Sequence, residues 1–260
     1  MAESGAGSPF AAFSLEGRVA LVTGASGVLG RHFARILHGA GARVAMGARK
    51  PASLRGLAEE LREGARAVAL DVTEDASIAD ALAVTERAFG PVDILVNNAG
   101  IAATRPFLDH TAEDWDQVMA VDLRGAFAMG QAVARRMVAA GNGGSIVNIA
   151  SILAERVIPG VAGYSAAKAA LVHLTRQMAV ELARHRIRVN ALAPGYIATE
   201  INRDFFASEA GQAVVKRIPQ RRLGTVDDLT GPLLLLASDA GAHMTGSVVT
   251  IDGGHSVNSL

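Results

Sequence analysis

Short apolar segments alternate with longer amphipathic segments along most of the chain. The apolar segments are rich in valine and isoleucine, and they lack the strict apolar and polar alternation of a strand with one face in water. They span residues 19–22, 44–46, 67–70, 92–96, 145–149, 187–192 and 247–251. This pattern predicts strands that are buried on both faces, and therefore a parallel sheet.

Between the predicted strands, apolar residues recur at helical spacing. The predicted helices span residues 28–39, 51–63, 75–89, 111–140, 163–185 and 226–238. Repeated alternation of strand and helix is typical of a doubly wound, Rossmann-like α/β fold with one topological switch point. Because no linker or internal repeat interrupts the pattern, we expect a single domain over residues 16–260, preceded by a flexible tail over residues 1–15.

Residues 197–217 form a longer connection than this fold requires, since a strand-to-helix loop is usually about 2–6 residues long. They follow a predicted strand, and ligands of open α/β sheets bind beyond the carboxyl ends of the strands. We therefore expect this insertion to lie on the binding side and to act as a lid.

Charge and composition limit the possible functions. The 260 residues include 25 basic and 25 acidic side chains, so no attraction to nucleic acid or to an anionic membrane is expected. The absence of cysteine excludes disulfides, thiolate nucleophiles and cysteine-based zinc sites, and no two histidines are four residues apart, so we expect no metal. The start of the chain does not resemble a signal peptide, and no apolar run approaches the roughly 18 residues that span a bilayer, so we expect a soluble, cytoplasmic protein.

A glycine-rich sequence, TGASGVLG, occupies residues 23–30, directly after the first predicted strand. Glycines at this turn let the backbone approach a pyrophosphate, which then lies at the positive end of the following helix. Gly24 and Gly30 fit this role. The alternative is a tight turn that only packs a helix on a strand, but the position within the first strand–helix–strand unit favours a dinucleotide.

The end of the second predicted strand indicates which dinucleotide. A site specific for NAD usually places an acidic side chain there for the ribose 2′-hydroxyl. No Asp or Glu occurs between Gly30 and Glu59, and Arg49 occupies the region where the acid would lie. Because arginine suits a 2′-phosphate, we expect NADP(H), with NAD(H) still possible. The alternative is that Arg49 is only a solvated charge at the start of a helix.

Residues 143–168 contain a candidate catalytic group. Ser151 follows a predicted buried strand, and Tyr164 and Lys168 lie four residues apart, on one face of a predicted helix. A free tyrosine titrates near pH 10, but a neighbouring ammonium favours the phenolate. A serine hydroxyl can hold a carbonyl oxygen while the tyrosine gives it a proton, with hydride supplied by a nicotinamide.

These motifs together resemble those of the short-chain dehydrogenase/reductase family, over residues 16–256. The matching pieces are the glycine loop, Asp71-Val72, NNAG at 97–100, Ser151, YSAAK at 164–168, PGYIAT at 194–199 and IDGG at 251–254. The resemblance implies a sheet of about seven parallel strands, NAD(P)-dependent interconversion of alcohols and carbonyls, and a homotetramer. The implied cofactor-binding residues are Gly24, Ser26, Gly27, Val28, Leu29, Gly30, Arg49, Asp71, Val72, Asn97, Asn98, Ala99, Gly100, Tyr164, Lys168, Pro194, Gly195, Ile197 and Thr199.

The chain departs from the family pattern in its glycine loop. The pattern TGxxxGxG places its middle glycine at position 28, where this chain has valine, with Gly27 one position earlier. Valine is unlikely to accept a positive φ angle. We expect a local rearrangement around Gly27 that preserves cofactor binding. The alternative is that Val28 weakens or abolishes it.

A second departure is Asp122, where similar family members usually have an asparagine that holds a water for proton relay from Lys168. An ionised carboxylate only accepts hydrogen bonds, and its charge would favour the ammonium form of Lys168. We expect an active enzyme with an altered pH profile. The alternative is that Asp122 only keeps a kink in its helix.

The sequence says less about the substrate. Apolar residues flank the catalytic group and recur in the predicted lid, which favours a largely apolar pocket for a ketone or secondary alcohol. They are Ile152, Leu153, Val157, Val161, Ile197, Phe205 and Phe206. The first hypothesis is an NADP(H)-dependent carbonyl reductase. Alternatives are a 3-oxoacyl-[acyl-carrier-protein] reductase, for which Arg124, Arg135 and Arg136 could dock an acidic carrier, and a catalytically weak scaffold or binding protein on the same fold.

Overall fold

The computed structural model describes residue 8 and residues 10–258. The predicted tail therefore lies partly outside the described residues. Within the described part, Ala11–Phe13 forms a single 3₁₀ turn, and Leu15 is buried with its N–H bonded to the carbonyl of Ala40. The packed part of the chain thus begins before residue 16.

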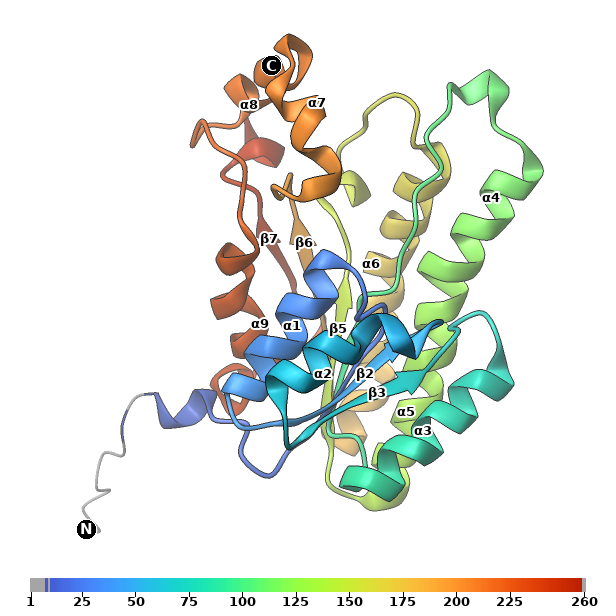
Figure 1. The fold of residues 1–260 in the computed structure, drawn as a ribbon, viewed down its shortest axis with the longest axis vertical. Coiled ribbons are helices and arrows are strands. Elements are labelled where there is room, and N and C mark those ends of the chain that lie inside the picture. The colour runs from blue at the N-terminus through green and yellow to red at the C-terminus, as the bar shows by residue number, and fades with distance from the viewer. Residues whose placement is uncertain (1–7, 9, 259–260) are drawn as a thin grey trace.

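Seven parallel strands form one sheet in the order β3-β2-β1-β4-β5-β6-β7 (Figure 1). They are β1 (Val19–Val22), β2 (Arg43–Ala48), β3 (Ala65–Ala69), β4 (Ile94–Asn97), β5 (Gly144–Ile149), β6 (Ile187–Pro194) and β7 (Val248–Ile251). The strand order reverses between β1 and β4, which makes this the topological switch point. The predicted doubly wound parallel sheet is confirmed, because each Val- and Ile-rich segment forms a strand.

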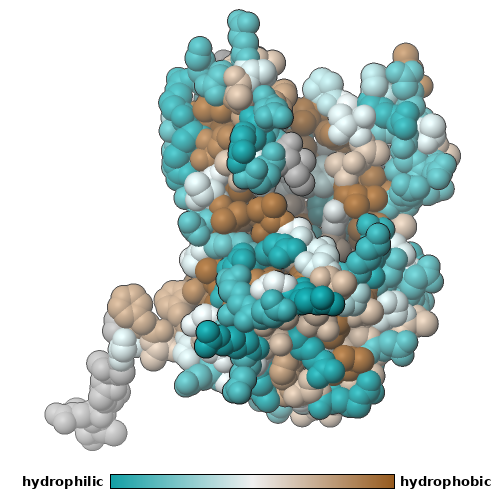
Figure 2. All heavy atoms as spheres, viewed as in Figure 1, coloured by the Kyte–Doolittle hydropathy of each residue, from teal (hydrophilic) through white to brown (hydrophobic). Residues whose placement is uncertain are grey.

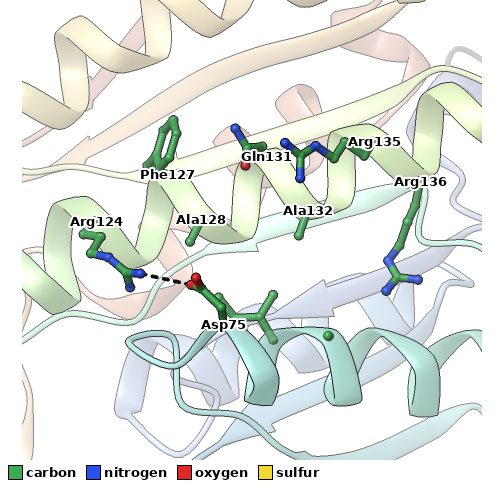
Figure 3. Close-up of a pocket in the computed structure, with 10 residues that line it drawn as sticks. Asp75, Arg124, Phe127, Ala128, Gln131, Ala132, Arg135 and Arg136 are labelled. Atoms are coloured by element: carbon green, nitrogen blue, oxygen red, sulfur yellow. Dashed lines mark hydrogen bonds and ion pairs between the residues drawn. The ribbon is translucent and has the colours of Figure 1, made fainter.

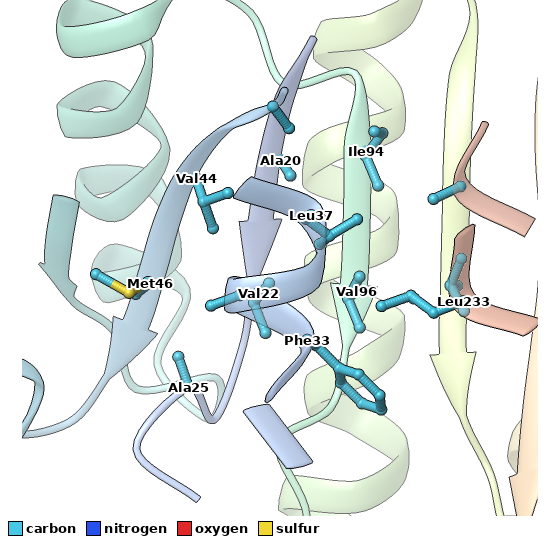
Figure 4. Close-up of a cluster of buried hydrophobic side chains, with 14 of the residues drawn as sticks. Ala20, Val22, Ala25, Phe33, Leu37, Val44, Met46, Ile94, Val96 and Leu233 are labelled. Atoms are coloured by element: carbon cyan, nitrogen blue, oxygen red, sulfur yellow. The ribbon is translucent and has the colours of Figure 1, made fainter. Parts of the chain in front are cut away.

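Helices cover both faces of the sheet. They are α1 (Val28–Gly39), α2 (Arg55–Leu61), α3 (Asp75–Phe89), α4 (Ala112–Met119), α5 (Ala126–Ala140), α6 (Ala162–Leu182), α7 (Arg203–Ala207), α8 (Glu209–Arg217) and α9 (Thr230–Ala237). On one face, Phe33 and Leu37 of α1 and Leu233 of α9 pack on Val22 and Val96 of the sheet (Figure 4). Residues of α3, α5 and α6 form the core on the other face.

The helical segment predicted over 111–140 is not one α-helix. Its start is capped by Thr111, whose side chain accepts the N–H of Asp114 while Asp114 accepts that of Thr111. A π-helical segment, Ala120–Gly125, then separates α4 from α5. On α4, Trp115 faces the start of α6, where a Cβ on Gly163 would lie 3.6 Å from its ring. The π-helical segment re-aims the helix where it passes the carboxyl ends of β4 and β5.

Residues 197–217 begin beyond the carboxyl end of β6 and contain the short helices α7 and α8 (Figure 1). Ile197 forms an isolated parallel bridge with Gly224, which ties the start of the segment to the body. Seen from the same side, the surface is hollowed between this segment and the α4 end of the molecule, and hydrophobic residues border the hollow (Figure 2). The segment therefore lies on the side of the sheet where ligands of this fold bind.

Candidate active site

The glycine loop joins the carboxyl end of β1 to α1. Gly24 has φ +61°, and a Cβ there would lie 2.8 Å from the Cα of Ala99. A Cβ on Gly30 would lie 2.4 Å from the carbonyl oxygen of Gly24 and 2.8 Å from Nδ2 of Asn98. Both positions therefore exclude any side chain, and the loop packs tightly against the start of the segment after β4. This fits a loop whose backbone and helix N-terminus face a pyrophosphate.

The backbone of Val28 does not have a positive φ angle. Gly27 is the extended N-cap of α1, and Val28 is its first helical residue. The non-glycine residues with positive φ among those described are Arg62, Arg186 and Arg221, so the positive φ that valine is unlikely to accept does not occur at Val28. The Val28 side chain is 39% exposed at the mouth of the loop, beside the exposed residues Ser26 and Gly27. Any effect of Val28 on cofactor binding thus depends on the space that its side chain occupies and not on its backbone conformation.

The side chains of the two asparagines in the NNAG motif form hydrogen bonds within the protein. Asn98 Nδ2 donates to the carbonyls of Thr23 and Gly24, at 2.9 and 3.1 Å, and its N–H donates to Thr23 Oγ1 at 2.9 Å. Asn97 is buried and donates to a carbonyl of α5 and to the side chain of Asn148. These hydrogen bonds therefore position the loop and the core. Sequence reasoning missed Thr23, whose hydroxyl organises this corner and which precedes the first glycine.

Arg49 and Asp71 lie beyond the carboxyl ends of β2 and β3, at the same edge of the sheet. Asp71 accepts hydrogen bonds from the Thr73 hydroxyl at 2.7 Å and the Thr73 N–H at 3.0 Å. These bonds, of which the one from the Thr73 hydroxyl has the largest effect, hold the pKa of Asp71 below its ordinary value despite partial burial. The charge of Arg49 adds to the effect. Val72 is buried next to them. This edge thus presents an ionised carboxylate and a guanidinium close together.

The structure brings the Ser-Tyr-Lys group to the carboxyl end of β5. Ser151 is buried there, and its Oγ accepts the N–H of Leu153 at 3.1 Å. The buried Lys168 of α6 donates from Nζ to the carbonyl of Ile149 at 3.0 Å. The same Nζ lies 5.4 Å from the centroid of the Tyr164 ring. The ammonium therefore lies beside the ring of the phenol.

Asp122 forms a buried ion pair with Lys168. Its Oδ2 lies 3.1 Å from Nζ, without good hydrogen-bond alignment, and its Oδ1 accepts the N–H of Ile101 at 2.8 Å. Burial raises the pKa of Asp122, and the charge of Lys168 and the bond from Ile101 oppose that effect. A Cβ on Gly100 would lie 2.8 Å from Oδ2, so this glycine leaves room for the carboxylate. The π-helical segment carries Asp122 into this position.

The segment after β6 is packed against its own surroundings. Pro194 ends β6, and a Cβ on Gly195 would lie 2.7 Å from Cβ of Asp252. The Thr199 N–H donates to Asn202. Ile197 is buried in the core on the α1 and α9 face, so its side chain is not part of an open substrate wall as we expected.

The three arginines considered for docking an acidic carrier line a groove of about 490 Å³ between α3 and α5 (Figure 3). Arg124 pairs with Asp75 at 3.1 Å, and Arg136 pairs with Glu86 at 2.8 Å. Among the residues described, Arg135 has no ion pair. Two of the three charges are thus neutralised locally.

Within residue 8 and residues 10–258, no three histidine or acidic side chains are arranged to hold a metal ion. No helix in that part of the chain is both long and apolar enough to cross a membrane.

Comparisons with known proteins identify the family of this chain. A family model described as enoyl-(acyl carrier protein) reductase matches residues 24–256. The chain is 41% identical to gluconate 5-dehydrogenase of Gluconobacter oxydans over 95% of this chain and 97% of that one. It is 39% identical to carbonyl reductase [NADPH] 2 of Sus scrofa over 93% of this chain and 98% of the relative.

A solved structure gives the same result. The crystal structure of a gluconate 5-dehydrogenase from Burkholderia cenocepacia in complex with NADP and tartrate superposes with a TM-score of 0.90 at 39% identity, covering 95% of this chain and 98% of that one. The fold, the site motifs and the length of the matches lead to one conclusion: the chain belongs to the short-chain dehydrogenase/reductase family, and it is an oxidoreductase of alcohol and carbonyl groups.

Proposed function

We propose that the protein transfers hydride between NADP(H) and a ketone or secondary alcohol of a polyhydroxylated compound, with Tyr164 as general acid and base. The observation that carries the proposal is Lys168 Nζ, held 5.4 Å from the Tyr164 ring and bonded to the carbonyl two residues before Ser151. A polyhydroxylated substrate is supported by the relatives named for gluconate and by the solved relative with bound tartrate.

The chain's residues divide the work as follows. Ser151 Oγ hydrogen-bonds the substrate oxygen, and the Tyr164 hydroxyl gives that oxygen a proton in reduction or removes it in oxidation. Lys168 favours the phenolate by its charge. Asp122 holds the ammonium, and the carbonyl of Ile149 fixes its position. The nicotinamide supplies or accepts the hydride when it is bound.

The residues at the switch point fit a dinucleotide. Any Cβ at Gly24 or Gly30 would fill the cradle at the start of α1, whose N-terminus favours the pyrophosphate. Arg49 lies where the 2′-phosphate of NADP would be expected, and the solved relative carries NADP. Arg49→Ala should lower the NADPH affinity about tenfold and leave the NADH affinity nearly unchanged, since a charge-assisted phosphate contact contributes roughly 1.5–3 kcal/mol.

The test is NADPH oxidation with a panel of ketoses, keto acids and simple ketones. Wild-type protein should reduce at least one of them, and Tyr164→Phe should abolish turnover while retaining NADPH binding, followed by nicotinamide fluorescence. A wild-type protein that binds NADPH but reduces none of the panel would support the scaffold alternative. Selective reduction of an acetoacetyl thioester would instead favour the acyl-carrier-protein reductase.

We also propose that the chain assembles through α5 and α6. A groove of about 390 Å³ runs between them, and its exposed apolar members include Phe127, 46% exposed, and Val138, 40% exposed. Apolar side chains exposed in this way are typical of a surface that another subunit covers. Sedimentation should show an oligomer for the wild type and a smaller species for Phe127→Glu/Val138→Glu.

A further inference from the structure

A cavity of about 380 Å³ adjoins the catalytic serine. One of its walls is Ile152 and Leu153, and Leu153 donates its N–H to Ser151 Oγ at 3.1 Å. Another wall is Tyr196, in the segment that follows β6. The volume lies within the range of small-molecule sites, about 300–1,000 Å³. The cavity is thus of a size for a substrate and is lined by the two residues that directly follow Ser151.

The remaining walls carry basic groups. Arg156 from the loop after Ser151, Arg217 from the end of α8 and His255 near the C-terminus all line the cavity, with Asn258 beside them. Seven other arginines of the described chain form ion pairs with Asp or Glu, but Arg156 and Arg217 form none within those residues. Arg156 has only a carbonyl as its partner, that of Ser256 at 3.3 Å. No residue among those described therefore neutralises the two guanidinium charges in this cavity by an ion pair.

His255 adds a polar atom that the described protein leaves unsatisfied. Its Nδ1 is buried and has no hydrogen-bond partner among the described residues. Burial lowers the pKa of His255, and the negative charge of Asp252 opposes that lowering. The positive charges of Arg156 and Arg217 lower the pKa further, so both arginines act on the imidazole. Asp252 forms no ion pair with either arginine among the described residues, and its oxygens accept the N–H groups of Gly254 and Ser256.

We infer that Arg156 and Arg217, together with His255, bind the carboxylate of the substrate, and that the substrate class is therefore polyhydroxylated carboxylic acids. This inference rests on the proposed function and names its substrate more closely. A carboxylate would form charge-assisted bonds with the planar guanidinium groups, and the carbon chain would extend along Ile152 and Leu153 toward Ser151. The expected apolar residues Ile152, Leu153 and Val157 do line the cavity, and the inference adds a basic side to it.

The experiment compares two ligands that differ at one terminal group. D-Gluconate carries a carboxylate where D-glucitol carries a hydroxymethyl group. Calorimetric titration of the full-length protein, saturated with NADPH so that neither alcohol can react, measures both dissociation constants for the wild type, Arg156→Gln, Arg217→Gln and the control Arg87→Gln on the distant end of α3. Arg87 is also exposed and forms no ion pair among the described residues.

Wild type and Arg87→Gln should bind gluconate at least tenfold more tightly than glucitol. Arg156→Gln and Arg217→Gln should each lower that preference about tenfold, the effect expected for one charge-assisted bond, and Arg156→Lys should restore part of it. Equal affinities of the wild type for both ligands would overturn the inference, as would a preference that survives both substitutions. Binding of D-glucitol 6-phosphate in place of gluconate would also overturn it, by assigning the site to phosphate.

The result also separates this inference from the proposed function. Arginine-dependent gluconate binding without any turnover would contradict the oxidoreductase but uphold the carboxylate site. Turnover of a neutral ketose, with no preference for gluconate, would uphold the oxidoreductase but contradict the carboxylate site. Binding is measured without catalysis, so Tyr164→Phe should retain the preference for gluconate.

Discussion

Replacing Asp122 with asparagine tests whether the buried ion pair with Lys168 sets the pH dependence of catalysis. The change keeps the shape of the side chain and an oxygen that can accept the N–H of Ile101, but it removes the charge 3.1 Å from Nζ. Without that charge, the positive site holds its protons less tightly. We expect the rising limb of the pH–rate profile for alcohol oxidation to move to lower pH, because the basic form of the site then appears earlier.

The size of the effect follows from the geometry. Two unit charges 3.1 Å apart interact by about 5 kcal/mol at an effective dielectric constant of ~20. Desolvation of the two ions costs several kcal/mol each and cancels much of this. If roughly a third of the interaction remains, the profile moves by about one pH unit, since a unit corresponds to about 1.4 kcal/mol. Removing one partner also leaves Lys168 without its counter-ion, so we expect a loss of stability.

The assay is initial rates from pH 6 to 10 with saturating NADP⁺, using Asp80→Asn, an exposed aspartate of α3, as the control. Stability gives a second result. Burial raises the folded-state pKa of Asp122 above its ordinary 3.8, so its contribution to stability is full below that value and is lost as pH rises through the raised pKa. That pH dependence should be missing from Asp122→Asn. A variant with the wild-type pH–rate profile would refute the role of the carboxylate and leave it as a support of the helix.

Three further predictions concern the glycine loop and a surface cap. Gly30→Ala should reduce NADPH affinity at least tenfold, because its Cβ would lie 2.4 Å from the Gly24 carbonyl, whereas Gly27→Ala meets that oxygen at 3.5 Å and should change little; equal losses in fluorescence titration would contradict the packing argument. Val28→Gly should leave the thermal midpoint nearly unchanged and should tighten NADPH binding only if the exposed valine obstructs the cofactor. The salt bridge from Arg222 has the largest effect on the pKa of Asp228, and together with the Thr225 N–H it holds that pKa below its ordinary 3.8. The stabilisation of the fold by Asp228 is therefore present above that value and is lost on acidification. Urea unfolding of the Asp228→Asn variant should therefore differ from wild type at pH 7, and the difference should shrink steadily as the pH falls below 3.8; a constant difference would argue against the ion pair.

The sequence predicted the sheet and the central site well because both depend on local patterns. Runs of valine and isoleucine mark strands buried on two faces, and each of these runs forms a strand of the sheet. Tyr164 and Lys168 share a helix face by spacing alone, and Ser151 lies two residues beyond the carboxyl end of β5. These features need no knowledge of distant contacts.

Other features could not be predicted because they depend on contacts between distant segments. The π-helical segment lies inside a pattern that fits a continuous helix, and Asp122 meets its partner 46 residues further along the chain, on α6. Arg156 could equally have been a surface residue. It lines a cavity because the chain near Ser256, 100 residues later, folds back beside it. We judged the backbone of Val28 from the family pattern, whereas its conformation follows from its place as the first residue of α1.

The π-helical segment also makes the number of residues in this helix matter as much as their identity. One residue of an α-helix corresponds to about 100° of rotation about its axis. Deleting a single residue within 120–125, so that the segment rewinds as α-helix, would turn α4 by about that angle relative to α5 and carry Trp115 away from Gly163. Evolution can therefore exchange side chains along α4 with little effect on the site, whereas the loss of one residue there would dismantle it.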